Sequence, residues 1–64
     1  MRVISRTELA RRNARELAAL YAWVSEEIFD APYGSQERRN GMISLENIRR
    51  EQARRNRAPQ PGGP

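Results

Sequence analysis

The side chains that perform most enzymatic chemistry are absent or isolated in this chain. It has no His and no Cys, which removes the commonest general base, the commonest metal ligand and the thiolate nucleophile. Glu26 and Glu27 are adjacent carboxylates, but acid–base catalysis needs a pocket that shifts their pKa values, so we interpret them as solvated helix surface. The sequence predicts no catalytic, cofactor or metal site, and therefore a protein that is not an enzyme.

Arginine supplies all of the basic side chains. The 64 residues include 12 Arg, no Lys and 8 acidic residues, which gives a net charge of +4. Such an excess of positive charge favours acidic proteins or nucleic acid as partners. The sequence contains neither an apolar run long enough to span a bilayer nor a signal-peptide pattern, so we expect a cytoplasmic protein with no membrane partner.

The start of the first helix carries the clearest local signal. Ser5 and Glu8 form the S-x-x-E pattern of a capping box. The apolar residues that follow recur at helical spacings on one arc: Leu9, Leu17, Leu20, Val24 and Ile28. We therefore expect one helix over about residues 6–29. Asn13 falls inside the apolar arc, either as a polar residue that sets the packing register or as a hydrated residue near the helix end.

A turn separates this helix from a second one. Pro32 pushes the residue before it out of the α region, and Gly34 continues the turn. Ser35 can cap a second helix, which we expect over about residues 36–54. Because the connection is short, the two helices should pack antiparallel.

The predicted fold class is all-α, a two-helix antiparallel hairpin with a disordered C-terminal tail. The hairpin occupies residues 1–56. Residues 57–64 are rich in Pro and Gly and have no apolar periodicity, so they cannot bury enough surface to offset their ordering entropy.

One stripe of the second helix should face the first. It contains Gly41, Leu45 and Ile48. Gly41 weakens a helix by up to ~1 kcal/mol relative to Ala. We interpret Gly41 as a point of close approach between the helices, with a functional kink as the alternative.

Charges are segregated along the chain. Residues 1–15 carry five Arg and one Glu, whereas residues 16–30 carry four acidic residues and no Arg. In an antiparallel hairpin the acidic end of the first helix would lie beside Arg38 and Arg39. The arginines of the open end would converge, either as a solvated surface or as a socket for an acidic surface or phosphates. They include Arg11, Arg12, Arg49 and Arg54.

A second group of apolar, aromatic and polar residues lies off the seam between the helices. Two helices share only one seam, so these residues need another surface to cover them, and aromatic and Arg side chains dominate interface energetics. We predict that they form a docking face for a protein partner: Trp23, Phe29, Tyr33, Arg39, Asn40, Ile43, Asn47 and Arg50. A homodimer through this face would produce the same composition.

Two segments of the chain resemble a known family. "ISRTELARR" (residues 4–12) and "ERRNGMISLENIRR" (residues 37–50) are similar to short proteins encoded on integrative and conjugative elements of proteobacteria, and among these to the QseM-type antiactivators. The resemblance implies a small helical protein that binds and blocks transcriptional activators. These are a quorum-sensing regulator of the LuxR/TraR type and an activator of excisionase expression. Excision and conjugative transfer of the element would then stay repressed.

Two other classes of function remain open. The first is a small nucleic-acid-binding protein that uses the Arg-rich open end, although acidic residues are interleaved there and two helices lack a separate recognition helix. The second is a structural oligomer or a different inhibitor carried by a mobile element, such as an anti-defence protein.

Overall fold

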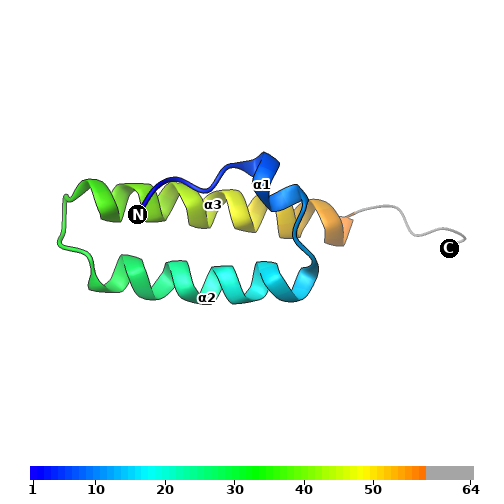
Figure 1. Ribbon diagram of the computed structural model, residues 1–64, viewed down its shortest axis with the longest axis horizontal. Helices are drawn as coiled ribbons and strands as arrows, with labels where there is room; N and C mark the ends of the chain where they lie inside the picture. Colours follow the sequence, from blue (N-terminus) through cyan, green and yellow to red (C-terminus); the bar gives the residue numbers. More distant parts are fainter. Residues whose placement is uncertain (58–64) are drawn as a thin grey trace, which may run out of the picture.

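The computed structural model describes residues 1–57 of the chain, and these residues form three helices. The helices are α1 (Arg6–Ala10), α2 (Ala14–Asp30) and α3 (Gln36–Arg57). α2 and α3 lie side by side and run in opposite directions, while the N-terminal segment and α1 lie along α3 (Figure 1). The fold is therefore all-helical as predicted, with three helices in place of two. Within residues 1–57, no helix has the length and apolar character needed to cross a membrane.

The prediction of one continuous helix over residues 6–29 is wrong, because the chain leaves the helical path before Asn13. The backbone of Asn13 is extended (φ −82°, ψ 172°), and its Oδ1 accepts from the Glu16 amide at 2.7 Å. The Glu16 carboxylate accepts in turn from the Asn13 amide at 2.9 Å. This second capping box starts α2, as the predicted box of Ser5 and Glu8 starts α1. Asn13 is thus a helix cap, which neither interpretation of it anticipated.

The second long helix begins where the sequence places it and ends later. Gly34 has φ of 77° in the turn, a conformation that favours glycine, and Ser35 Oγ accepts from the Arg38 amide at 3.0 Å. α3 then continues through Arg57, beyond the predicted end near residue 54. Of the predicted tail, Arg57 belongs to α3, and residues 58–64 lie outside the described part of the chain.

Three parts of the chain contribute side chains to the core. The buried apolar residues come from the N-terminal segment and α1 (Ile4, Leu9), from α2 (Leu17, Val24) and from α3 (Ile48). The partly buried residues that pack against them are Met1, Leu20, Ile28 and Leu45. The N-terminal segment therefore covers a part of α3 that a two-helix hairpin would leave open.

α2 approaches α3 closely at Gly41. A β-carbon built on Gly41 would lie 2.7 Å from Cγ1 of Ile28 and 3.7 Å from Sδ of Met1. α3 is one unbroken helix on both sides of Gly41. The interpretation of Gly41 as a close-approach residue is confirmed, and the alternative of a kink is not observed.

Candidate functional site

Residues 1–5, which we call the strap, run along α3 and are held by its side chains. The Asn40 side-chain amide donates to the carbonyl of Met1 at 2.9 Å. Ser44 Oγ accepts from the amide of Ile4 at 2.9 Å, and the Asn47 side-chain amide donates to the carbonyl of Ile4 at 3.0 Å. Residues four and three positions apart share one face of a helix, so these three side chains form a ladder along α3.

This ladder changes the interpretation of the predicted docking face. Asn40 and Asn47 were both assigned to it, but their amide groups are engaged by backbone carbonyls of the strap. A backbone carbonyl that leaves water needs a hydrogen-bond donor, which explains why polar residues stand at these positions. Part of the second surface that the docking face required is therefore supplied by the chain itself.

Ser44 is a central residue that sequence reasoning missed. Its side chain is completely buried, and its hydroxyl donates to the Asn40 carbonyl at 2.8 Å while accepting from the amide of Ile4. One signal could have revealed it, namely the stripe of small polar residues at positions 40, 44 and 47 on the face that also contains Glu51.

Glu51 organises the open end of the molecule. Glu51 is only 3% exposed, and its carboxylate accepts from Arg54 at 2.6 Å and from Arg55 at 2.8 Å. The hydrogen bond from Arg54, which has the larger effect, and the hydrogen bond from Arg55 hold the pKa of Glu51 at about 2. Arg55 also donates to the carbonyl of Leu9 at 3.1 Å, which ties α3 to the C-terminal end of α1. The positive charge of the arginines at the open end is thus partly neutralised by the Glu51 carboxylate.

Trp23 lies beside an apolar groove next to the strap. Its side chain is 46% exposed. The groove has a volume of about 320 Å³, and its apolar lining comes from Met1, Ile4, Leu20 and Trp23. A second hollow of about 370 Å³ continues past Leu20 and Trp23 toward Ala19. Trp23 is therefore a half-exposed aromatic ring between two apolar hollows.

The rim of these hollows is polar, and its charges are paired. Arg2 and Glu8 form a two-pronged ion pair with both distances at 2.7 Å. The hydrogen bonds from Arg2 hold the pKa of Glu8 at about 2. Arg12 and Glu16 lie 3.8 Å apart on the same side. An apolar centre with a polar rim is the usual anatomy of a protein interface.

Ile43 lies on α3 one turn from both Asn40 and Asn47, at the margin of the covered face. Its side chain is 45% exposed, close to the value for Trp23. Gly41 faces α2, and by helical phase Ile43 lies on the opposite side of the ladder that holds the strap. A partner that contacts both Ile43 and Trp23 must therefore reach across the strap.

Phe29 and Tyr33 are the most exposed of the predicted residues, at 86% and 89%. Phe29 follows Trp23 by six residues in α2, which places the two side chains about 120° apart around the helix. The ring of Tyr33 lies in the turn, where the Arg38 guanidinium stacks on it at 4.3 Å. The structure therefore does not gather Phe29 and Tyr33 with Trp23 into one compact patch.

The predicted pairing of acidic α2 residues with the start of α3 takes a different form. Arg38 donates to the carbonyl of Ile28 at 2.7 Å, at the C-terminal end of α2, where the helix dipole favours a cation. Among residues 1–57 no ion pair joins α2 to α3. Arg39 is exposed and lies in none of these pairs, whereas Arg50 pairs with Glu46 on its own helix at 3.0 Å.

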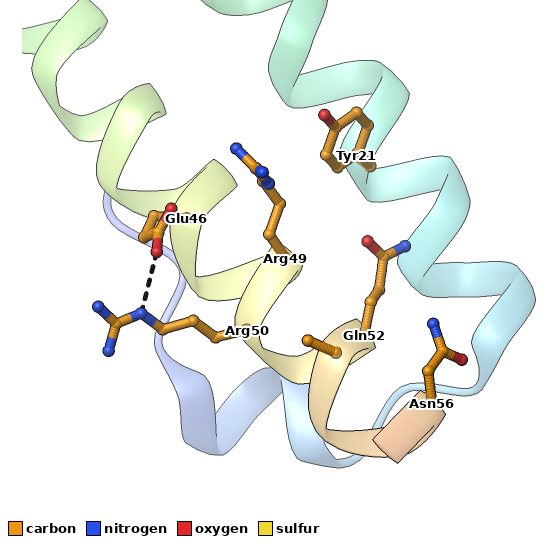
Figure 2. A pocket seen from close by; sticks show the side chains of 7 residues that line it. Tyr21, Glu46, Arg49, Arg50, Gln52 and Asn56 are labelled. Atoms are coloured by element: carbon orange, nitrogen blue, oxygen red, sulfur yellow. Dashed lines mark hydrogen bonds and ion pairs between the residues drawn. The ribbon is translucent and has the colours of Figure 1, made fainter.

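A groove lined mostly by polar residues lies between α2 and α3 near the open end. Figure 2 shows Arg49 reaching from α3 toward Tyr21 of α2, with Gln52 and Asn56 further along α3. The groove has a volume of about 470 Å³. Arg50 also lines the groove, and its guanidinium bonds to Glu46. Arg49 lies in no ion pair within the described residues, so this groove presents an unneutralised guanidinium.

No group of three His, Cys, Asp or Glu side chains within residues 1–57 is placed to hold a metal ion. Trp23 on α2 and Ile43 on α3 are the exposed apolar residues of the candidate site beside the strap.

Comparisons of the chain with protein-family models, with curated protein sequences and with solved structures gave no match.

Proposed function

We propose that this chain is a protein-binding regulator that acts as an antiactivator, and that it docks on a transcriptional activator through the surface around Trp23. The observation that carries the proposal is the half-exposed Trp23 ring beside an apolar groove of about 320 Å³. Binding energy in protein interfaces concentrates in a few aromatic and Arg residues that sit in such hollows.

The class of partner comes from the resemblance of residues 4–12 and 37–50 to the QseM-type antiactivators. On this proposal the partners are an activator of the LuxR/TraR type and an activator of excisionase expression. The chain represses excision and conjugative transfer of a mobile element in the cytoplasm by sequestering these activators.

The shape and the charges of the surface around Trp23 support the following contacts. An apolar side chain of the activator enters the groove between the strap and α2, where Leu20 and Trp23 line both hollows. The ion pairs of Arg2 with Glu8 and of Arg12 with Glu16 form the polar rim. Ile43 contributes a second apolar contact on the other side of the strap.

The direct test measures binding of the purified full-length chain to a LuxR/TraR-type activator and repression of that activator's promoter in a reporter strain. Trp23→Ala and Ile43→Asp should each weaken binding by about thirtyfold or more, the effect of losing a hot-spot residue, and should release the promoter. Phe29→Ala is the matched control, because it removes a more exposed aromatic ring on a different face of α2 and should leave binding within about threefold of wild type.

Circular dichroism of each variant separates loss of binding from loss of folding. Wild-type binding by both Trp23→Ala and Ile43→Asp would place the docking surface elsewhere on the molecule. Equal loss in all three variants would also exclude the proposed surface.

A nucleic-acid-binding function is the second candidate, and the groove between Arg49 and Tyr21 favours it. An unpaired guanidinium beside an aromatic ring can contact a phosphate and a stacked base together. Arg49→Gln should then abolish binding to single-stranded DNA or RNA, and the affinity of the wild type should fall steeply with salt. Binding of an activator through apolar contacts should depend little on salt.

A further inference from the structure

We propose that the strap and α1 exchange between two copies of this chain, so that residues 1–10 of each copy occupy the face of α3 in the other. The face of α3 that the strap covers is then a binding site for a second copy, and the structure shows the closed, single-chain form. The proposal concerns association of the chain with itself and does not depend on the docking surface around Trp23.

The contacts that hold the strap depend on its position on α3 and would be the same if the strap belonged to another copy. Each hydrogen bond from Asn40, Ser44 and Asn47 to the strap joins residues at least 39 positions apart in sequence. The buried side chains of Ile4 and Leu9, which fill the core of their own chain in the closed form, would fill the core of the other copy in the exchanged form. A second copy carries these groups at identical spacing, so its strap can make the same contacts with this face of α3.

The hinge for such an exchange is short and contains neither Pro nor Gly. It consists of residues 11–13, between the end of α1 and the start of α2. The apolar residues on the two sides share one helical arc, since Leu9 and Leu17 lie eight residues apart and about 80° from each other around a continuous helix. The sequence is thus compatible with one straight helix over α1 and α2, although the closed form breaks it.

Straightening the hinge carries α1 away from its own α3. The carbonyls of Leu9 and Ala10, which Arg55 contacts in the closed form, would instead accept from the amides of Asn13 and Ala14 along the helix. Ile4 and Leu9 would lose their cover, and the stripe around Ser44 would lose its hydrogen-bond partners. Two straightened copies restore both by exchanging residues 1–10, whereas one straightened copy alone cannot.

Two substitutions at the hinge push the equilibrium in opposite directions. Asn13→Ala removes the capping box that starts α2 and places a strong helix former in the hinge. Ala14→Pro acts the other way: proline is well accepted at the first position of a helix, and the extended backbone of Asn13 suits a residue before proline. In a straight helix, however, a proline ring at position 14 would clash with the carbonyl of Ala10.

The experiment is sedimentation equilibrium of the full chain over a concentration series, with circular dichroism to confirm helicity. Wild type should show a concentration-dependent monomer–dimer equilibrium. Asn13→Ala should raise the association constant by about thirtyfold. When the wild-type dimer forms, each of its two hinges loses the capping box of Asn13, whereas the variant has no capping box to lose. Ala14→Pro should be folded and monomeric at every concentration.

Isotope-filtered NMR on a mixture of labelled and unlabelled chains identifies which surfaces meet in the dimer. Exchange predicts intermolecular contacts between Ile4 of one copy and Ser44 of the other. Monomeric behaviour of both wild type and Asn13→Ala would overturn the proposal. So would a dimer that persists in Ala14→Pro, or one whose intermolecular contacts run through Ile43 while the contact of Ile4 with Ser44 stays within one chain.

Discussion

Ile28 of α2 occupies the space in which any other residue at position 41 would place its side chain. The distance from Ile28 Cγ1 to a β-carbon built on Gly41 is 2.7 Å, shorter than carbon atoms in contact allow. Isoleucine is branched at its β-carbon and therefore stiff at χ1, and Cγ1 is not the flexible tip of the side chain. The backbone of α3 can approach α2 this closely only because position 41 has no side chain.

We expect Gly41→Ala to destabilise the fold despite the better helix propensity of alanine. Alanine favours a helix interior by about 1 kcal/mol over glycine. Overpacking against Ile28 costs about 1–3 kcal/mol, so the free energy of unfolding should fall by roughly 1 kcal/mol. Urea denaturation followed by circular dichroism measures this change. In an Ile28→Ala background the same substitution should become stabilising, and a cost that persists there would mean that Ile28 is not its cause.

Loss of the Ser44 hydroxyl should loosen the strap. Ser44→Ala leaves the amide of Ile4 without its partner in a buried position, which costs about 1–3 kcal/mol. The melting temperature should drop, and the amide of Ile4 should exchange faster with solvent deuterium. Ser25→Ala is the matched control, because that hydroxyl only donates to the Tyr21 carbonyl within α2. Equal effects of the two substitutions would contradict the role assigned to Ser44.

Leu17 is a buried member of the core, whereas Leu20 and Leu45 are partly buried and pack against it. Leu17→Ala should lower the free energy of unfolding by about 2–5 kcal/mol, comparable to the whole stability of a domain of this size. Most of the helical signal in circular dichroism should then be lost at room temperature. Met42→Ala, at an exposed position of α3, should change the stability by less than about 0.5 kcal/mol. A well-folded Leu17→Ala would show that the core is organised differently.

Acid should weaken the fold through Glu51 and Glu8. The pKa of each is about 2 in the folded chain, against an ordinary value near 4.5. A carboxyl group with a depressed pKa stabilises the fold fully above its unfolded value, and this contribution is lost as the pH falls from about 4.5 toward 2. Melting temperatures recorded across this range should fall accordingly.

Glu51→Gln should be less stable at neutral pH and should lose less of its remaining stability in acid. Glu26→Gln is the control, since Glu26 is exposed and lies in no ion pair within residues 1–57, and it should follow the wild-type profile. An acid profile of Glu51→Gln that parallels wild type would exclude Glu51 as a source of the pH dependence.

Local signals in the sequence predicted the local parts of this fold. The capping box of Ser5 and Glu8, the turn at Gly34 and the cap at Ser35 each involve neighbours in sequence, and each is present. The break before Asn13 was also locally encoded, as a second box with Glu16, but the shared apolar arc of α1 and α2 favoured one helix.

The strap could not be predicted in this way, because its partners are distant. Asn47 donates to a backbone carbonyl 43 residues away, and although the polar stripe at positions 40, 44 and 47 marks that face of α3, no local pattern identifies the partner. For the same reason the sequence assigned Asn40 and Asn47 to an external partner, although their partner lies in the same chain. The exposure of Trp23 and Ile43 agrees with their predicted position off the seam.

The ladder on α3 also matches the spacing of residues along the extended strap to the spacing of residues along the helix. The carbonyls of Met1 and Ile4 are three residues apart and are held by Asn40 and Asn47, which are seven residues apart. An extended chain advances ~3.3 Å per residue and an α-helix ~1.5 Å, so both intervals measure ~10 Å. Because the ladder contacts only main-chain atoms, it constrains the number of residues between its rungs far more tightly than their identity. Over generations, substitutions at Arg2 and Val3 should therefore accumulate much more readily than the insertion or deletion of a single residue there.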